Sequence, residues 1–175
     1  RMVDWTDRAT CCLFGDAAGA ALIENCDISP HFEFSVRGSA EHLKIGRGGD
    51  NCPYHFSDSN NILEMTGQEI FKFAVGAIAD RVQDVLKNTG ITANEVSAYL
   101  FHQANLRILK SAVSRLSLTW DQVPINLDRY GNTSSATVAV LLDEVNRAQT
   151  LKRGDKIILC AFGGGLASAA CLLEW

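Results

Sequence analysis

The stretch Val96-Ser97-Ala98-Tyr99-Leu100-Phe101 is an almost unbroken apolar run, and the polar residues His102-Gln103-Ala104-Asn105 follow it directly. A short apolar run with so little alternation is typical of a strand that is buried on both faces. The residues from Asn105 to Leu116 are predicted to form a helix. The stretch is therefore interpreted as strand, polar junction and helix, which is the building unit of α/β proteins.

Before this unit, the residues from Thr66 to Asn88 give the clearest helical pattern in the chain. Their apolar residues recur at steps of three and four and form one stripe. Thr66 and Glu69 have the spacing of a capping box, and Gly90 is predicted to end the helix as a left-handed cap. A second capping box, from Thr92 to Glu95, predicts a short helical turn before the buried strand.

The other predicted elements complete an alternation of strands and helices. Strands are expected at 10–14, 17–23, 28–36, 123–127, 157–162 and 166–175, with a helix at 132–148 and a loop at 38–61. The small residues of 15–21 suggest that another backbone packs closely there. In the 28–36 strand, Phe32, Phe34 and Val36 share one face, which is expected to be buried. The predicted fold is a single α/β domain over residues 1–175, with a mixed, mostly parallel sheet and helices on both faces.

Composition narrows the class of protein. The 175 residues are 47% hydrophobic and 21% charged, the balance of a globular domain. A formal net charge of −4 argues against non-specific nucleic-acid binding. No apolar stretch reaches the roughly 20 residues of a membrane helix, so no membrane association is expected. Because Arg1 precedes the first Met, a truncated chain is expected.

The six cysteines are Cys11, Cys12, Cys26, Cys52, Cys160 and Cys171. None forms a C-x-x-C pair, so no metal site is predicted. Cys11, Cys12, Cys160 and Cys171 lie in apolar runs and are interpreted as buried, reduced thiols, which fits a cytoplasmic location. None has the expected setting of a nucleophile, which is a tight turn at a helix N-terminus.

Three junctions carry residues that are able to do chemistry, and each has a plain structural alternative. His102 can project into a cleft from the end of its strand, or it can cap the next helix. Asn132, at a helix start after Gly131, can donate to an oxyanion or simply serve as a cap. The glycines of Gly163–Gly165 can present a bare backbone N–H to a ligand, or they can form a tight turn.

Taken together, these junctions resemble those of one family, the β-ketoacyl-acyl-carrier-protein synthases III. The resemblance lies in 102–108 (HQANLRI), 126–134 (NLDRYGNTS) and 162–166 (FGGGL), and in 13–20 (LFGDAAGA), which is similar to the strand motif that opens the family's second half. It implies a thiolase-like fold built from two similar halves, usually as a homodimer. This chain would supply the C-terminal half, and the N-terminal half would be absent from it.

The resemblance also implies a reaction. A cysteine of the missing half takes an acyl group from a short acyl-CoA such as acetyl-CoA. A decarboxylating Claisen condensation with malonyl-acyl carrier protein (ACP) then starts fatty acid biosynthesis. His102 and Asn132 would stabilise the enolate, and the Gly164 N–H the other oxyanion. The substrates are CoA and ACP thioesters, and no further cofactor is expected.

Three further residues match binding positions of the family. Phe71 would lie near the acyl and pantetheine tunnel, Asn105 near the CoA arm, and Arg107 at the acidic helix of ACP. Phe71 as plain helix core and Arg107 as a solvated charge are the alternatives. Two other functions stay open for the chain, namely a non-catalytic subunit of a synthase-like heteromer and a related thiolase-fold condensing enzyme that acts on another acyl-CoA.

Overall fold

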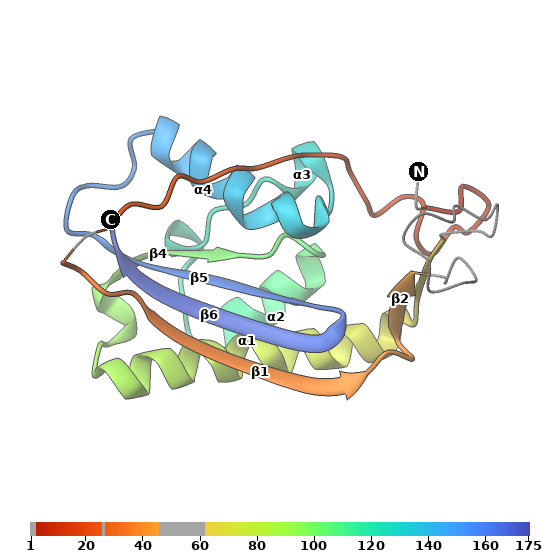
Figure 1. Cartoon of the computed structure of the whole chain (residues 1–175), viewed down its shortest axis with the longest axis horizontal. Coiled ribbons are helices and arrows are strands. Elements are labelled where there is room, and N and C mark those ends of the chain that lie inside the picture. Colours follow the sequence, from red (N-terminus) through yellow and green to blue (C-terminus); the bar gives the residue numbers. More distant parts are fainter. Residues whose placement is uncertain (1–2, 26, 46–61) are drawn as a thin grey trace.

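The computed structural model describes residues 3–25, 27–45 and 62–175. Its main sheet contains β1 (His31–Ser39), β4 (Val96–Phe101), β5 (Lys156–Gly163) and β6 (Gly165–Glu174) in the order β1-β6-β5-β4 (Figure 1). β4 and β5 are parallel, while β6 is antiparallel to both β5 and β1. The sheet is therefore mixed, as predicted, and its parallel part is the β4–β5 pair.

Helices cover both faces of this sheet, also as predicted. α1 (Gly67–Thr89) and α2 (Leu106–Arg115) pack on one face, and α4 (Thr137–Arg147) lies on the other (Figure 1). Ile78, Val82 and Leu109 belong to the core of the first face, and Leu141 and Val145 to that of the second. Apolar side chains at helical spacing are thus removed from water on each side of β4 and β5.

The structure confirms two of the three predicted features at the ends of the helices and corrects the third. Gly90 ends α1 in the left-handed conformation with φ 70°, and the capping box of Thr92 and Glu95 closes a 3₁₀ turn at Ala93–Glu95, both as predicted. The Thr66 side chain makes no cap hydrogen bond, so the first predicted capping box is wrong. Glu69 instead forms an ion pair with Lys72.

The predicted strand at 123–127 is also wrong. The chain there leaves a 3₁₀ turn at Trp120–Gln122 and enters the short helix α3 (Leu127–Tyr130). Pro124 lies inside the apolar run, and a proline cannot donate to a strand ladder. The helix predicted from Asn132 begins later, because a 3₁₀ turn at Ser134–Ala136 precedes α4.

The N-terminal segment does not form the two predicted strands. Phe14 makes an isolated parallel bridge with Asn132, and residues 16–25 make no backbone hydrogen bond to another described residue. The segment runs beside α4 (Figure 1). A Cβ on Gly19 would overlap the Cβ of Ala139, and one on Gly15 would overlap the Tyr130 carbonyl oxygen. The small residues therefore do allow a close approach, as predicted, although the partner is not a strand.

Part of the predicted loop at 38–61 is ordered as a strand. β2 (Leu43–Ile45) pairs antiparallel with β3 (Leu63–Met65) at one end of the molecule. Gly38 and Ser39 belong to β1, residues 40–42 form no helix or strand, and residues 46–61 lie outside the described part of the chain. None of the helices in the described ranges is long and apolar enough to cross a membrane.

One apolar face of the sheet is open to solvent. Glu33 accepts a hydrogen bond from Asn88 of α1, so Phe32, Phe34 and Val36, which alternate with it, point away from α1. Phe34 is 75% exposed. In the register of the sheet, Phe32 lies opposite Cys171 and Phe34 opposite Ala169, next to the part of the face that α4 covers. The strand prediction for β1 was correct, but the expectation that its aromatic face is buried was wrong, because no described residue covers it.

Candidate active site

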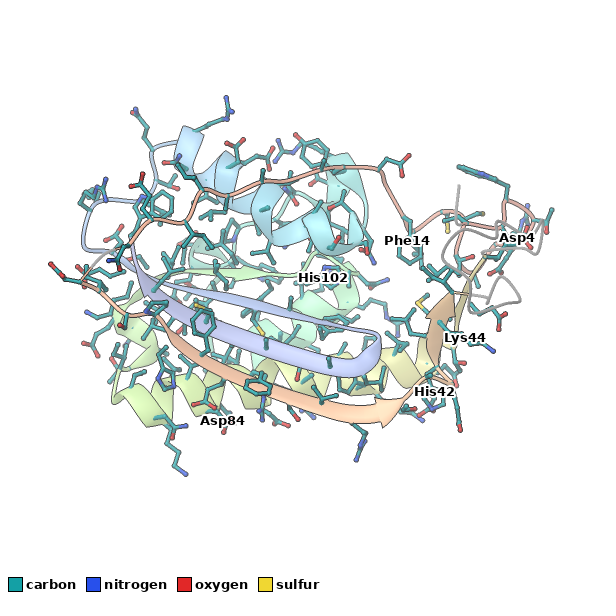
Figure 2. All side chains as sticks on the ribbon, in the orientation of Figure 1. Asp4, Phe14, His42, Lys44, Asp84 and His102 are labelled. Carbon is teal, nitrogen blue, oxygen red and sulfur yellow. The ribbon has the colours of Figure 1, made fainter. Side chains whose placement is uncertain are left out.

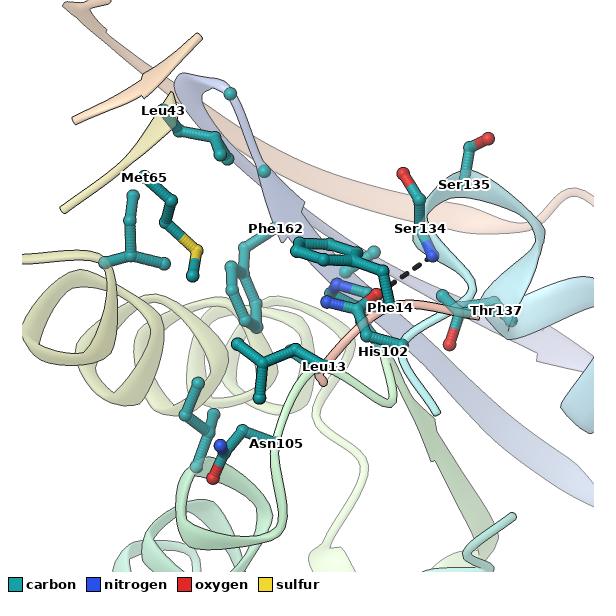
Figure 3. Close-up of a pocket in the computed structure, with 18 of the residues that line it drawn as sticks. Leu13, Phe14, Leu43, Met65, His102, Asn105, Ser134, Ser135, Thr137 and Phe162 are labelled. Atoms are coloured by element: carbon teal, nitrogen blue, oxygen red, sulfur yellow. Dashed lines mark hydrogen bonds between the residues drawn. The ribbon is translucent and has the colours of Figure 1, made fainter. Parts of the chain in front are cut away.

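A cavity of about 850 Å³ opens where the carboxyl ends of β4 and β5 meet α1 and the segment before α4. Its lining includes the predicted residues Phe71, His102, Asn105, Asn132 and Gly164. The volume lies within the usual range for small-molecule sites. Figure 3 shows His102 and Asn105 on the β4–α2 side of this cavity, with Ser134 and Thr137 facing them. The structure thus brings five of the six predicted side chains or backbone groups to one place.

His102 stands at the end of β4 and is 7% exposed (Figure 2). Its backbone N–H donates to the Cys160 carbonyl at 2.8 Å, which extends the β4–β5 pairing by one residue. Its ring lies edge-on to Phe162, with 5.1 Å between ring centroids. Burial lowers the pKa of His102 to about 4, so the imidazole is neutral at pH 7. His102 therefore points into the cavity instead of capping α2.

The two ring nitrogens of His102 are not equivalent. Nδ1 is buried and has no hydrogen-bond partner among the described residues. A neutral imidazole carries its proton on one nitrogen only, and an unpartnered N–H costs more than an unpartnered lone pair. We therefore place the proton on Nε2, which leaves that N–H available as a donor.

Asn132 is held by its backbone and by its own side-chain oxygen. Its N–H donates to Leu13 O at 2.8 Å, and its carbonyl accepts from Gly15 N at 3.0 Å. Its Oδ1 accepts from Ser134 N at 2.9 Å, the dashed line in Figure 3. The carboxamide is thereby oriented, and its Nδ2 has no partner among the described residues. Asn132 is not the N-cap predicted for the following helix, because Thr133 is the N-cap of the 3₁₀ turn and Ala136 that of α4. Its carboxamide contacts Ser134 N and offers a donor to the cavity.

Asn105 and Arg107 start α2 at the rim of the cavity. Asn105 Oδ1 accepts from Arg107 N at 2.8 Å, so Asn105 caps the helix. The exposed Arg107 does not line the cavity, but its guanidinium lies 5.5 Å from the ring centroid of Phe71. Phe71 is partly buried against the core and also lines the cavity, so both interpretations of Phe71 fit. Gly164 forms the turn between β5 and β6.

The four described cysteines are free, and two of them lie beside the cavity. Burial raises the pKa of Cys160 to about 12 and raises that of the half-buried Cys171 as well. A nucleophilic thiol needs a lowered pKa, so neither is suited to attack a thioester. Cys160 is buried as predicted, whereas Cys12 is exposed, which corrects that part of the cysteine prediction. Cys26 and Cys52 lie outside the described residues.

The sequence reasoning missed several residues that support this site. Phe162 was included in the glycine-turn motif without a role of its own, yet its ring packs against His102. Gln103 is fully buried and links the His102 junction to residue 126. Glu144 binds the segment that precedes Asn132. Gln103 adjoins a candidate catalytic residue, which was a usable signal, whereas nothing in the local sequence of Glu144 points to this contact.

Comparison with known proteins agrees with this arrangement. Residues 86–175 match the family model for the 3-oxoacyl-[acyl-carrier-protein (ACP)] synthase III C terminal, and residues 1–38 match a model for 3-oxoacyl-[acyl-carrier-protein (ACP)] synthase III. The chain belongs to the 3-oxoacyl-ACP synthase III family. The family resemblance seen in the sequence is thereby confirmed.

Two curated relatives named β-ketoacyl-[acyl-carrier-protein] synthase III show the extent of the match. The chain is 42% identical to the Clostridium beijerinckii protein and 41% identical to the Clostridium novyi protein, over 100% of this chain and 56% of each relative. This chain therefore spans little more than half the length of these family members.

Solved structures support the fold. The synthase III structures from Thermus thermophilus and Aquifex aeolicus superpose with TM-scores of 0.83 and 0.82 at 36% and 33% identity. They cover 99% of this chain, and the match spans 55% and 54% of theirs. The thiolase-like fold predicted from the motifs is confirmed.

Proposed function

We propose that this chain supplies the enolate-stabilising part of a β-ketoacyl-ACP synthase III active site, and that the nucleophilic cysteine comes from residues beyond it. The observation that carries the proposal is that His102, Asn132 and Gly164, which belong to three separate junctions, line one cavity. The complete protein would transfer a short acyl group from acyl-CoA to its cysteine and condense it with malonyl-ACP, which starts fatty acid synthesis.

The two side-chain donors suit the decarboxylation step. Loss of carbon dioxide from a malonyl thioester leaves an electron pair that delocalises onto the thioester oxygen. The Nε2–H of His102 and the Nδ2–H of Asn132 would donate to that oxygen as its charge develops. Because His102 is neutral and buried, it stabilises the anion without protonating it. Removal of one such donor usually costs about 3–4 kcal/mol in the barrier.

The condensation step would use the turn between β5 and β6. The enolate carbon attacks the carbonyl carbon of the acyl-cysteine, and a carbon–carbon bond forms as the carbonyl oxygen becomes an oxyanion. The Gly164 N–H would donate to this oxygen. Collapse of the tetrahedral intermediate breaks the carbon–sulfur bond and returns the cysteine as a thiolate. The reaction consumes the two thioester substrates and one proton, and it releases CoA and carbon dioxide.

The rim residues suit the arms of these substrates. Phe71 and Asn105 line the cavity on the α1 and α2 side, where a pantetheine chain would run. Arg107 is exposed beside Phe71, and it would contact an acidic surface of ACP.

The buried donors favour an enzyme over a non-catalytic subunit. A His that lies 93% out of solvent with an unpartnered ring nitrogen is costly to the fold. A structural subunit gains nothing from such a group, whereas catalysis does.

The test compares two partial reactions in the complete protein, namely acetyl transfer from acetyl-CoA to the cysteine and decarboxylation of malonyl-ACP. His102→Ala and Asn132→Ala are expected to slow decarboxylation about 10²–10³-fold and to leave acetyl transfer largely unchanged. Asn146→Ala, which removes an exposed asparagine from α4, is the matched control and is expected to behave like the wild type. Decarboxylation within twofold of wild type in both active-site variants would refute the proposal.

The exposed apolar face of β1 is a second feature that bears on the complete protein. Because the relatives are longer than this chain, we propose that the remaining residues of the complete protein cover the face formed by Phe32, Phe34 and Val36. Binding of a separately produced N-terminal half is expected to be lost in Phe34→Asp and retained in Ser35→Asp, whose side chain points to the opposite face. Equal binding by both variants would contradict this assignment.

A further inference from the structure

One carboxylate on α4, that of Glu144, contacts three residues of the segment that leads to Asn132. Asn126 Nδ2 donates to Glu144 Oε2 at 2.8 Å, and the Tyr130 hydroxyl donates to Oε1 at 2.9 Å. Arg129 adds an ion pair, with Nη1 2.8 Å from Oε1. Burial pushes the pKa of Glu144 upward, but these hydrogen bonds and the Arg129 charge outweigh it and lower the pKa. Glu144 is therefore ionised at pH 7 and holds α3 at both ends.

The same side of α4 also holds the His102 junction. Thr137 Oγ1 accepts from the backbone N–H of Gln103 at 2.9 Å. Thr137 and Glu144 are seven residues apart, about two helical turns, so they project from the same side of the helix. Gln103 closes the network, because its Oε1 accepts from Asn126 N at 3.2 Å. α4 thus contacts the supports of both candidate donors.

The backbone between α3 and Asn132 is short, so the position of α3 affects that of Asn132. Gly131 has φ 67° and ψ −160°, a conformation that turns the chain sharply after Tyr130. Asn132 is also bound by Leu13 and Gly15, but both contacts are made through its backbone. Because Asn132 Oδ1 accepts from Ser134 N while the backbone of Asn132 follows Gly131, a shift of α3 relative to Ser134 would rotate the Asn132 carboxamide relative to His102.

We propose that Glu144 is a positioning residue that sets the direction of the Asn132 carboxamide relative to the His102 ring. The catalytic consequence rests on the function proposed above, whereas the structural consequence does not.

The first experiment uses the complete synthase and the variants Glu144→Ala and Glu144→Gln. Glu144→Ala is expected to lower kcat for malonyl-ACP decarboxylation about tenfold, less than the 10²–10³-fold of losing a donor outright. KM and acetyl transfer are expected to stay within about twofold, because neither depends on the Asn132 donor. Glu144→Gln keeps one acceptor oxygen for Tyr130 or Asn126 and is expected to recover most of the rate.

A double-mutant cycle separates positioning from general destabilisation. In the Asn132→Ala background, Glu144→Ala is expected to cause no further loss of decarboxylation, because the group that it orients is already gone. Asp143→Ala, which breaks only an exposed ion pair with Arg147 on the same helix, is the matched control and is expected to resemble the wild type. Additive losses, or an equal loss of acetyl transfer, would overturn the proposal.

Amide hydrogen exchange tests the placement without activity. The N–H groups of Gly131, Asn132 and Ser134 are hydrogen-bonded to Leu127 O, Leu13 O and Asn132 Oδ1. Glu144→Ala is expected to speed their exchange at least about tenfold relative to Asp143→Ala, with α1 unaffected. Unchanged exchange refutes positioning by Glu144. If the wild-type synthase shows no decarboxylation, the proposed function is wrong, and the exchange result still decides the role of Glu144.

Discussion

Burial of the His102 ring predicts a distinct pH dependence of stability. The folded protein holds His102 with a pKa of about 4, against a reference value of 6.5. Because the folded pKa is lower, the unfolded chain binds the proton more readily, and stability falls as the pH drops from about 6.5 toward 4. At pH 5 the penalty is about 2 kcal/mol, from RT times the logarithm of the ratio of the two binding polynomials. At pH 7 it is close to zero.

The measurement is urea unfolding of the chain at pH 7, 6 and 5, beside the variant His102→Gln, which cannot titrate. The difference in the free energy of unfolding between wild type and variant is expected to change by about 2 kcal/mol between pH 7 and pH 5. Most of this change falls between pH 6 and pH 5. Carboxylates whose pKa is lowered in the fold, such as Glu33 and Glu95, lose their contribution mainly below about pH 5. They affect both proteins equally and cancel in the difference.

Nuclear magnetic resonance gives a direct check of the same prediction. The imidazole Cε1 proton of His102 is expected to keep a constant chemical shift from pH 8 to pH 5. Parallel stability profiles for wild type and His102→Gln, or a His102 titration with a midpoint above about 6, would refute the idea that burial holds this ring neutral.

Two further predictions concern the N-terminal segment and the thiols. Gly15→Ala is expected to destabilise the fold by about 1–3 kcal/mol, because its Cβ would overlap the Tyr130 carbonyl oxygen and disrupt two backbone hydrogen bonds to Asn132. In urea unfolding, Gly38→Ala, which meets nothing within 4 Å, is expected to match the wild type; equal losses in both would contradict the close approach. Iodoacetamide at pH 8 is expected to alkylate the exposed Cys12 at least about 100-fold faster than the buried Cys160, as read by peptide mass spectrometry. Comparable rates would show that Cys160 is accessible.

The parts of the fold that the sequence predicted well are those whose partners lie nearby in the chain. The apolar stripe of α1 and the buried run of β4 each carry their own period, and both were located to within a residue or two. His102 and the Gly163–Gly165 turn were each placed after a strand, where open α/β sheets bind ligands, and β4 and β5 are parallel and end at the same edge. That the two junctions share one site was implied by the family resemblance.

The failures have a common physical origin in pairing and tertiary contact. Residues 17–23 have strand-like composition but no partner strand among the described residues, and backbone groups without a ladder do not form a strand. Residues 123–127 are apolar, but Pro124 removes a donor where a ladder would need one. Glu144 lies 12 residues beyond Asn132, and only the packing of α4 against α3 brings them into one network.

The aromatic face of β1 shows why periodicity alone cannot predict burial. Alternation identifies Phe32, Phe34 and Val36 as one face, and they are one face, yet the burial expected for it depends on residues that must cover it. The same face continues onto Ala169 and Cys171, which line the candidate active-site cavity together with Phe32. The uncovered surface and the open cavity are therefore one continuous feature. A segment of the complete protein that covered Phe34, as proposed above, would therefore lie beside the cavity that His102 and Asn132 line.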